Sequence, residues 1–186
     1  MTSSEEQVVL LDERGEPIGV AAKATVHTEN TPLHLAFSCH VSDGQGRLLV
    51  TRRALGKRAW PGVWTNSFCG HPAPGEDPSL AVLRRAADEL GAELAYLTLV
   101  LPEFRYRATD ALGIVEHEVC PVYRATLVGE LRPNPEEVMD WHWVDEAEFA
   151  DAVAASPFAF SPWLVLQLPE IVESRPKAAA GSSTED

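Results

Sequence analysis

The chain has 186 residues, 45% of them hydrophobic, and a formal net charge of −13 at pH 7. This size suits one domain with a substantial core, and the charge argues against bulk nucleic-acid binding, because phosphate backbones require a basic surface. No apolar run approaches the ~20 residues that span a bilayer, and residues 1–6 lack the basic flank and apolar segment of a secretory signal, so we expect a soluble, cytoplasmic protein.

Strand patterns recur along the chain and are interrupted by a few helical segments. The expected strands are Val8–Leu11, Pro17–Ala22, Leu35–Val41, Leu48–Arg52, Thr98–Arg107, Glu116–Leu127 and Trp141–Val144. Residues 42–46 are rich in turn formers, which predicts a hairpin between the strands on either side. Late in the chain, we expect helices at Glu146–Ala155 and Pro162–Ser174.

The domain boundaries follow from composition. Residues 1–7 are expected to be a flexible N-terminal extension, and residues 8–175 to form one α/β domain without an internal repeat or linker. Residues 176–186 are poor in core-forming side chains, which favours a disordered tail.

The central helix has the clearest boundary signals in the chain. Asp77 is a good N-cap, Pro78 suits the first helical position, and Gly91 supplies a left-handed stop. We expect its apolar face to consist of Leu80, Leu83, Ala87 and Leu90.

Just before this helix, residues 60–71 place the thiol of Cys69 two residues from the imidazole of His71. In an extended segment, side chains at i and i+2 share a face, so both groups would project into one space. The alternative is a buried cysteine near a loop histidine. Three cysteines form no paired framework, and we expect free thiols.

Basic residues gather in the first part of this acidic chain, whereas the acidic excess is heaviest later. A local basic funnel in an acidic protein favours a small anion over a polyanion. The early basic residues include Lys23, Arg47, Arg52, Arg53, Lys57, Arg58, Arg84, Arg85, Arg105 and Arg107.

The helix and its preceding loop also carry a spaced motif, G-x5-E-x7-R-x3-[D/E]-E-x-G. Its members are Gly70, Glu76, Arg84, Asp88, Glu89 and Gly91. The motif resembles the Nudix box, a loop-helix-loop whose carboxylates hold a divalent cation on a diphosphate, and adjacent acidic residues suit Mg²⁺. A hydrolysing box has a glutamate where this chain has Arg85. Exchanging a carboxylate for a cation is expected to weaken metal-assisted water attack and to favour holding a diphosphate intact.

Together with further blocks, this motif gives a resemblance to the type 1 isopentenyl diphosphate isomerases over about residues 8–170. The blocks are residues 33–38, 51–54, 60–71, 104–109, 116–122 and 160–163. The resemblance implies an α/β fold with a Nudix-like mixed β-sheet core flanked by helices in a single domain. It also implies interconversion of isopentenyl diphosphate and dimethylallyl diphosphate, in isoprenoid biosynthesis, through a carbocation-like state.

The resemblance implies four catalytic side chains. Glu118, polarised by a metal and assisted by Tyr106, would protonate the alkene, and Cys69 would carry out the opposite proton transfer, with the direction of each role left open. Trp163 would shield the cation with its indole face, and the alternative is an ordinary core tryptophan. The diphosphate would be bound by Lys23, Arg53, Lys57 and Arg85.

Two metal sites are implied as well. The first would be a mixed nitrogen and oxygen shell suited to Mn²⁺, Zn²⁺ or Mg²⁺, formed by His27, His34, His71, Glu116 and Glu118. At the second, Glu89 and the Cys69 carbonyl would hold a Mg²⁺ with the diphosphate. The basic and imidazole side chains expected to be solvated or structural are Arg52, Arg58, Arg84, His40, His117 and His142.

Two other classes of function remain open. A Nudix pyrophosphohydrolase of another diphosphate would release phosphate or a monophosphate, and a non-catalytic metal-stabilised binding module would not need Cys69. The expected partner is a small-molecule diphosphate rather than a nucleic acid or a membrane, with the protein acting as a monomer or a homodimer.

Overall fold

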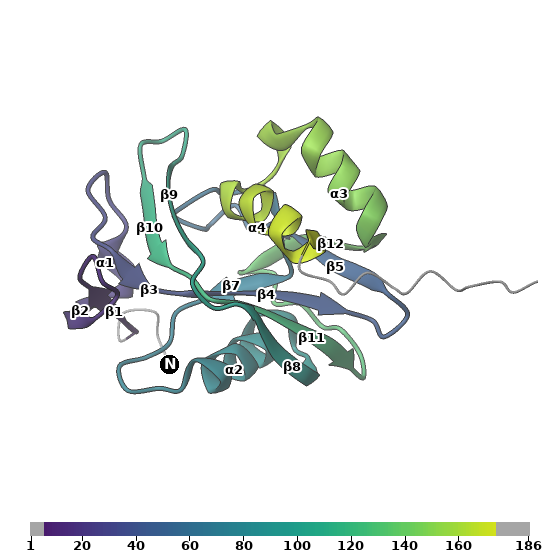
Figure 1. The fold of residues 1–186 in the computed structure, drawn as a ribbon, viewed down its shortest axis with the longest axis horizontal. Coiled ribbons are helices and arrows are strands. Elements are labelled where there is room, and N and C mark those ends of the chain that lie inside the picture. Colours follow the sequence, from purple (N-terminus) through teal and green to yellow (C-terminus); the bar gives the residue numbers. More distant parts are fainter. Residues whose placement is uncertain (1–5, 174–186) are drawn as a thin grey trace, which may run out of the picture.

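In a computed structural model, residues 6–173 of the protein are described. The chain forms two β-sheets, and helices cover both faces of the larger sheet (Figure 1). The predicted tail at 176–186, residues 1–5 of the predicted extension and the last residue of the final predicted helix lie outside the described residues. No helix among residues 6–173 is long and apolar enough to cross a membrane.

The smaller sheet has five strands in the order β2-β1-β3-β10-β9. Its strands are β1 (Gln7–Leu11), β2 (Pro17–Ala22), β3 (His34–Leu35), β9 (Arg105–Thr109) and β10 (Val115–Val119). β3 runs parallel to β10 and antiparallel to β1, so it joins the N-terminal hairpin to the β9–β10 hairpin. This arrangement places His34 directly opposite Glu118 in the strand register.

The larger, seven-stranded sheet has the order β12-β5-β4-β11-β8, with β6 paired to β5 and β7 paired to β4. Its strands are β4 (Phe37–Ser42), β5 (Arg47–Arg53), β6 (Trp64–Thr65), β7 (Phe68–Gly70), β8 (Glu93–Leu101), β11 (Val122–Val128) and β12 (Val138–Asp145). β11 is parallel to β4 while the other pairs are antiparallel, which confirms the predicted mixed sheet. The predicted hairpin at residues 42–46 is also present between β4 and β5.

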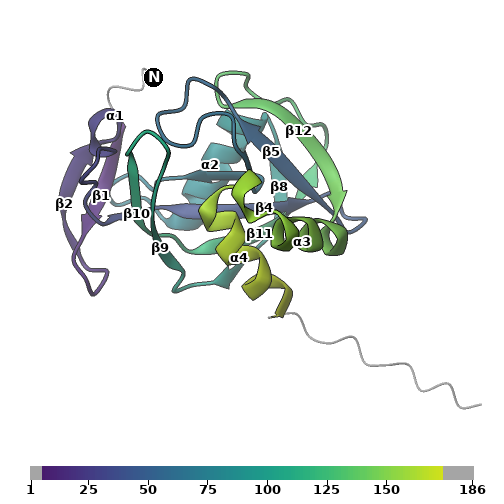
Figure 2. The same ribbon diagram turned by 90° about the horizontal axis from the view of Figure 1, so that it is seen from above.

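The helices divide between the two faces of the larger sheet. They are α1 (Lys23–Val26), α2 (Pro78–Leu90), α3 (Glu146–Ala155), the 3-10 helix η1 (Pro157–Ala159) and α4 (Pro162–Glu173). α2 lies on one face, and α3 and α4 lie on the other, as the two views in Figures 1 and 2 show. Each face therefore has its own apolar core.

Strand β4 contributes to both cores because successive side chains point to opposite faces. Phe37, Cys39 and Val41 are completely buried in the core beneath α2. Ser38 and His40 point the other way, where both hydrogen-bond to Gln167 of α4. β4 thus presents polar groups to the face that α4 covers.

The predicted ends of α2 are confirmed. The Asp77 carboxylate accepts a hydrogen bond from the Ser79 backbone at 2.8 Å, and Gly91 has the left-handed φ of 57°. A side chain at that glycine would also collide with the backbone of Arg132, since a Cβ atom added there would lie 2.5 Å from the Arg132 carbonyl oxygen. Both ends of the helix are therefore fixed by local geometry.

The predicted apolar face of α2 is wrong. Leu80 and Leu83 are 59% and 39% exposed, Ala87 is also exposed, and only Leu90 of the predicted set is buried. The buried face is instead made of Ala81, Val82, Arg85, Ala86, Glu89 and Leu90. Small alanines let the helix approach the sheet, and the polar pair among these residues is buried because it faces the cavity described below.

Three predicted strands are each divided in two. Residues 35–41 divide at Ala36, residues 98–107 turn between Leu101 and Arg105, and residues 116–127 divide at Pro121. The break at Pro121 is where the chain passes from β10 in the smaller sheet to β11 in the larger one, and proline, which has no N–H, interrupts strand pairing at that point. The Pro121 carbonyl still accepts a hydrogen bond from Ser38 across this junction at 3.1 Å.

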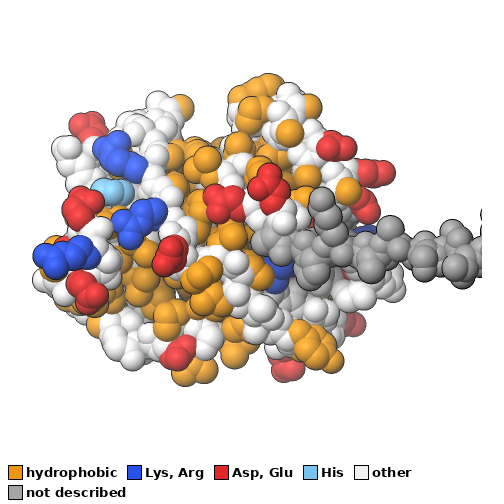
Figure 3. Space-filling view, viewed as in Figure 1, with side chains coloured by type: hydrophobic (Ala, Val, Ile, Leu, Met, Phe, Trp, Pro, Cys, Tyr) orange, Lys and Arg blue, Asp and Glu red, His pale blue; other side chains and the backbone are white. Residues whose placement is uncertain are grey.

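Charge is unevenly distributed over the surface. On the face in Figure 3, most of the visible lysine and arginine side chains, and a histidine, lie over the smaller sheet, and the other half shows mainly acidic side chains. Acidic side chains are also visible over the smaller sheet, so this face does not form a uniformly basic patch (Figure 3).

Candidate active site

A cavity of about 460 Å³ lies where the two sheets meet, bordered by α1, β7, α2, β9, β10 and the start of α4. Its walls contain every side chain predicted for the site except His34, which is completely buried behind them. The predicted residues in the walls are Lys23, His27, Arg53, Lys57, Cys69, His71, Arg85, Glu89, Tyr106, Glu116, Glu118 and Trp163. Segments separated by more than a hundred residues thus supply one site.

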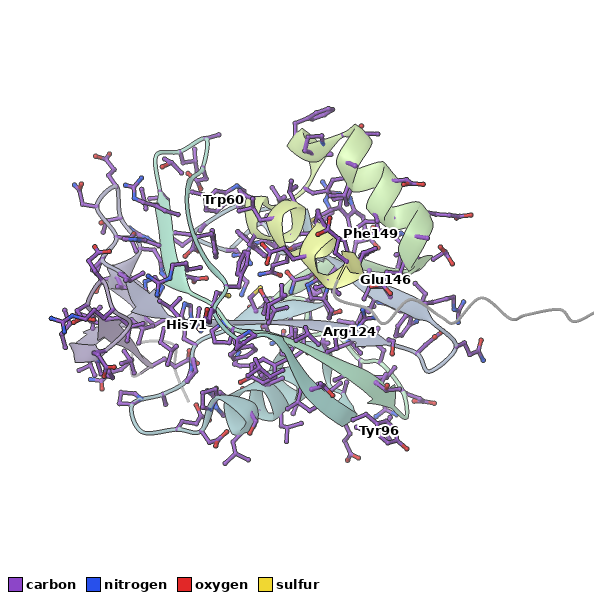
Figure 4. All side chains as sticks on the ribbon, viewed as in Figure 1. Trp60, His71, Tyr96, Arg124, Glu146 and Phe149 are labelled. Atoms are coloured by element: carbon purple, nitrogen blue, oxygen red, sulfur yellow. The ribbon has the colours of Figure 1, made fainter. Side chains whose placement is uncertain are left out.

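Three histidines and a glutamate converge at one end of the cavity. One nitrogen of each of His27, His34 and His71 and one oxygen of Glu118 lie within 4.8 Å of one another. The Glu118 Oε1 atom is 3.2 Å from His71 Nε2 and 3.5 Å from His34 Nε2. Figure 4 shows His71 between the smaller sheet and the larger one. Mixed imidazole and carboxylate ligands of this kind suit Zn²⁺, Mn²⁺ or Mg²⁺.

Hydrogen bonding supports a cation at this cluster. Among the described residues, His27 Nε2, His34 Nε2, His71 Nδ1 and Glu116 Oε2 are buried without a hydrogen-bond partner. Leaving buried polar atoms unpaired is costly, and a coordinated ion is one way to satisfy them. The other nitrogen of His34, Nδ1, lies 2.9 Å from the Pro32 carbonyl, which leaves Nε2 free to ligate. The residues present therefore fit a divalent metal ion.

Glu116 stands slightly apart from the four residues of this cluster. It shares a face of β10 with Glu118, as the two-residue period of a strand requires, and its Oε2 atom lies 3.1 Å from His27 Nε2. The neighbouring strand β9 places Tyr106 directly opposite Glu118. The strand register thus brings a phenol beside the predicted acid.

The two glutamates titrate differently. Burial raises the pKa of Glu118, but the neighbouring imidazoles of His34 and His71 outweigh it and hold that pKa well below its ordinary range. Burial and the neighbouring Glu118 charge raise the pKa of Glu116 well above its ordinary range. A divalent cation is the partner that would let both carboxylates carry charge.

The histidines of the cluster are suited to metal binding in their neutral form. Burial lowers the pKa of His71 to about 3 and that of His27 to about 4. Burial also lowers the pKa of His34, but the Glu118 carboxylate, 3.5 Å from His34 Nε2, outweighs it and raises that pKa overall. Neutral imidazole is the form that ligates metals.

Cys69 approaches the cavity from β7, and its thiol has two partners. The Sγ atom lies 3.2 Å from Ser38 Oγ and 3.4 Å from Asn66 Oδ1. Burial raises the pKa of the Cys69 thiol to about 12, so the surrounding side chains alone keep it protonated at neutral pH. Sequence reasoning missed Ser38 and Asn66, although Asn66 lies inside the block of residues 60–71.

An aromatic wall closes another side of the cavity. Trp163 is 2% exposed, and its ring packs at centroid distances of 5.5 Å from Trp60 and 5.8 Å from Tyr106. Its Nε1–H donates to Asn66 Oδ1 at 2.9 Å, and the Arg53 guanidinium lies 5.4 Å from its ring centroid. Asn66 therefore accepts hydrogen bonds from both Cys69 and Trp163.

The basic side chains at the mouth of the cavity are paired with carboxylates. Lys23 Nζ lies 2.6 Å from Glu6, and Lys57 forms an ion pair with Glu137. Arg53 differs, because it donates to the backbone carbonyls of Ala59 and Trp60. Trp60 itself lies between the β9–β10 hairpin and α4 (Figure 4).

Arg85 is the most enclosed of these cations. It donates to Glu89 at 2.5 and 3.1 Å and to Glu137 at 3.2 Å. Burial lowers the pKa of Arg85, but the Glu89 charge outweighs it and raises that pKa overall. Sequence reasoning missed Glu137, since a glutamate in the loop before β12 has no local signal that points to α2.

The basic residues predicted to be solvated or structural make contacts within the protein, and Arg58 is also among the residues that line the cavity. Arg84 pairs with Glu76 at 2.7 and 2.8 Å, Arg58 donates to the His27 carbonyl at 2.6 Å, and Arg52 donates to the Gly62 carbonyl. Of the remaining histidines, His40, His117 and His142, none is among the described residues that line the cavity. The three cysteines are free thiols, as predicted.

The chain is similar in sequence to known proteins. The sequence model of the NUDIX domain family matches residues 32–164. A protein named isopentenyl-diphosphate Delta-isomerase from Leifsonia xyli is 64% identical over 173 residues, covering 92% of this chain and 94% of that protein. The proteins of the same name from Agromyces mediolanus and Klebsiella pneumoniae are 67% and 59% identical, covering 89% and 87% of this chain and 80% and 88% of their own lengths.

Solved structures show the same fold at low sequence identity. The structure of DR0079 from Deinococcus radiodurans is 20% identical with a TM-score of 0.69, covering 89% of this chain and 99% of that one. A MutT NUDIX hydrolase from Burkholderia pseudomallei is 24% identical with a TM-score of 0.58, covering 74% and 97%. The predicted fold class is confirmed. On the sequence matches, the chain belongs to the NUDIX family and, within it, to the isopentenyl-diphosphate Delta-isomerases.

Proposed function

We propose that the chain interconverts isopentenyl diphosphate and dimethylallyl diphosphate. The observation that carries the proposal is the meeting of Cys69 and Glu118, from strands of two different sheets, in one cavity with a metal-binding cluster and a buried indole. Moving a double bond adds a proton at one carbon and removes one from another. Two separate proton-transfer groups around one small volume suit that chemistry.

Glu118 is one of the two proton-transfer groups, and its partner in the opposite transfer is Cys69. A divalent ion held by the three histidines, Glu116 and Glu118 would polarise the Glu118 carboxyl group and fix its orientation. Tyr106 lies beside it, and burial together with the Glu118 charge raises the pKa of Tyr106 well above its ordinary value. The phenol therefore keeps its proton and can donate a hydrogen bond to the reacting carboxyl group.

Cys69 carries out the proton transfer at the other carbon. Trp163 supports the positive charge that develops between the two transfers, because a cation over an indole face gains roughly 2 kcal/mol when water is excluded. With 2% of its surface exposed, this indole is shielded from bulk water. Cys69 thus supplies a proton transfer, and Trp163 stabilises the carbocation-like state and shields it from water.

The diphosphate binds at the mouth of the cavity through Lys23, Arg53, Lys57 and Arg85. Their present partners are carboxylates and carbonyls, so binding exchanges these contacts for phosphate oxygens. Glu89, freed from Arg85, and the Cys69 carbonyl would hold the Mg²⁺ that accompanies the diphosphate. The native ion at the histidine cluster is Mn²⁺, Zn²⁺ or Mg²⁺.

Arg85 favours isomerisation over hydrolysis of the diphosphate. A hydrolysing box needs a carboxylate near this position, and here a guanidinium with 5% of its surface exposed donates to two glutamates. A guanidinium can bind an anion, but it cannot act as a general base that activates a water molecule. The substrate is a small water-soluble anion, so the proposal places the reaction in the cytoplasm without a nucleic acid or membrane partner.

The test is conversion of isopentenyl diphosphate to dimethylallyl diphosphate by the purified chain, with phosphate release followed in parallel. We expect conversion that a chelator abolishes and that added Mg²⁺ and Mn²⁺ restore, without phosphate release. Conversion that continues unchanged in the metal-free protein would contradict the proposed role of the ion. Phosphate release without conversion would favour the pyrophosphohydrolase.

A further inference from the structure

Gln167 is a polar residue in the middle of an apolar helix face. It is completely buried on α4, where its neighbours Leu164, Leu168 and Ile171 belong to the core. A buried amide costs free energy unless it is hydrogen-bonded, whereas a leucine at the same position would not carry that cost. The side chain does not line the cavity, so it does not touch substrate.

The hydrogen bonds of Gln167 lead toward Cys69. Its Nε2 group donates to Ser38 Oγ at 2.9 Å, and its Oε1 atom lies 3.1 Å from His40 Nε2. Ser38 and His40 are two residues apart on β4, so one amide spans the two side chains on that face of the strand. Ser38 in turn is the register partner of Cys69, and its Oγ lies 3.2 Å from Cys69 Sγ.

The orientation of the amide follows from His40. Among the described residues, His40 Nδ1 is buried without a partner, so a proton there would be an unsatisfied donor. A proton on Nε2 instead finds the Gln167 Oε1 atom. This tautomer turns the amide oxygen toward His40 and the amide N–H toward Ser38, which is the arrangement with most groups satisfied.

The consequence for Ser38 is a fixed direction for its hydroxyl. Because Ser38 Oγ accepts from Gln167, its own proton is available to sulfur, and the nearest sulfur is that of Cys69. A second sulfur, Cys120 Sγ, lies farther away at 3.6 Å. On its other side, Cys69 donates to Asn66 Oδ1 at 3.4 Å. The Cys69 sulfur therefore accepts a hydrogen bond from Ser38 and donates one to Asn66.

We propose that Gln167 is a positioning residue, which acts through Ser38 to hold the Cys69 sulfur toward the cavity. This inference rests on the proposed function for its effect on turnover, but its effect on the thiol can be measured without substrate. A small displacement of a reacting group can reduce the rate about a hundredfold, so a residue outside the cavity can matter for turnover.

The experiment is a double-mutant cycle in the full chain with Gln167→Met, Ser38→Ala and the double variant. Methionine is unbranched and fills the space of glutamine, and alanine removes one oxygen from Ser38. Ser42→Ala is the matched control on the same strand, because its hydroxyl contacts Ala125 and Thr126 instead of the thiol. Thermal unfolding of each variant shows whether it is folded.

Turnover is the first readout. We expect kcat to fall about tenfold in each single variant while KM stays within about twofold, since neither side chain touches substrate. The double variant should lose no more than Ser38→Ala alone, because the two residues act in series. Losses that multiply in the double variant, or a wild-type kcat in folded Gln167→Met, would overturn the proposal.

Alkylation of Cys69 by iodoacetamide, located by mass spectrometry and followed over a range of pH so that the thiolate fraction is separated from access to the sulfur, is the second readout. We expect about threefold slower alkylation in both single variants, because a sulfur released from Ser38 turns away from the cavity for part of the time. An unchanged alkylation rate in both variants would reject positioning even if the wild type isomerises. If both single variants slow alkylation, the double variant slows it no further and the wild type does not isomerise, positioning would be supported and the proposed function rejected.

Discussion

Arg85 and Glu89 lie one turn apart on α2 and are joined by hydrogen bonds of 2.5 and 3.1 Å. Each residue has 5% of its surface exposed. Exposed pairs at this spacing contribute little, but this pair lies in the wall of the cavity, where each member is proposed to take part in binding the diphosphate. Each member can therefore give up its present partner, Arg85 for the diphosphate and Glu89 for the accompanying cation.

Replacing Arg85 by alanine is expected to weaken substrate binding without creating hydrolysis. Loss of a charge-assisted contact to an anion costs ~1.5–3 kcal/mol, which corresponds to roughly ten- to a hundredfold in apparent affinity. Steady-state kinetics with isopentenyl diphosphate and a phosphate-release assay measure both effects. Arg84→Ala is the matched control, because Arg84 pairs with Glu76 at the loop and should leave KM within about twofold. Equal effects of the two substitutions would remove Arg85 from the site.

Glu89→Gln is expected to behave differently from Arg85→Ala. Loss of the carboxylate removes a proposed Mg²⁺ ligand while leaving Arg85 available, so the diphosphate would still bind but the alkene would be misplaced. We expect kcat to fall about a hundredfold, with a smaller change in KM. A change confined to KM would show that Glu89 contributes to binding alone.

Cys69→Ala is expected to fold and to lose at least about a hundredfold in turnover, the usual scale for a general acid or base. Cys39→Ala serves as the control, because that thiol is completely buried in the other core, beneath α2. Its variant, and Cys120→Ala, should retain most of the activity. Near-wild-type turnover by the Cys69 variant would take the thiol out of the mechanism.

Removal of a ligand from the histidine cluster should lower bound metal and activity together. We expect His34→Ala and Glu116→Gln each to reduce metal content, measured by plasma mass spectrometry after dialysis, and to lower turnover about tenfold or more. His142→Ala is a suitable control, since that side chain packs against Trp64 away from the cavity. Full metal content in both variants would show that the ligands are misassigned.

His40 should make the stability of the fold depend on pH. Burial lowers its pKa to about 4, against an unfolded value near 6.5, so the unfolded chain binds the proton more readily. Stability from this group is therefore complete above about pH 6.5 and is lost as the pH falls from about 6.5 to about 4, by about 3 kcal/mol in total. Urea unfolding of the wild type and His40→Gln at several pH values should show a smaller loss in the variant. Parallel curves would contradict the assignment.

Local signals in the sequence predicted the ends of α2 and the shared space of Cys69 and His71. The buried face of α2 could not be predicted in the same way. A periodic pattern offered Leu80 and Leu83 for the core, but the fold exposes both and instead buries Arg85 and Glu89, whose side chains line the cavity. The usual preference for buried leucine therefore gave the wrong face of the helix.

Long-range pairings were beyond the reach of sequence patterns. Glu137 meets Arg85 although 52 residues separate them, and Gln167 meets Ser38 across 129 residues. Neither contact has a spacing that a periodic pattern could reveal. The site residues that were anticipated came from family resemblance, and residues that act through another side chain, such as Ser38 and Gln167, were missed.

Incubation with isopentenyl diphosphate in D₂O, followed by NMR, is the sharpest test of isomerisation, because a proton taken from solvent at the alkene leaves deuterium in the product. We expect the wild type to form deuterated dimethylallyl diphosphate with an intact diphosphate, and Cys69→Ala and Glu118→Gln to lose this product. Release of inorganic phosphate faster than any deuterium enters the carbon chain would contradict the proposed isomerisation.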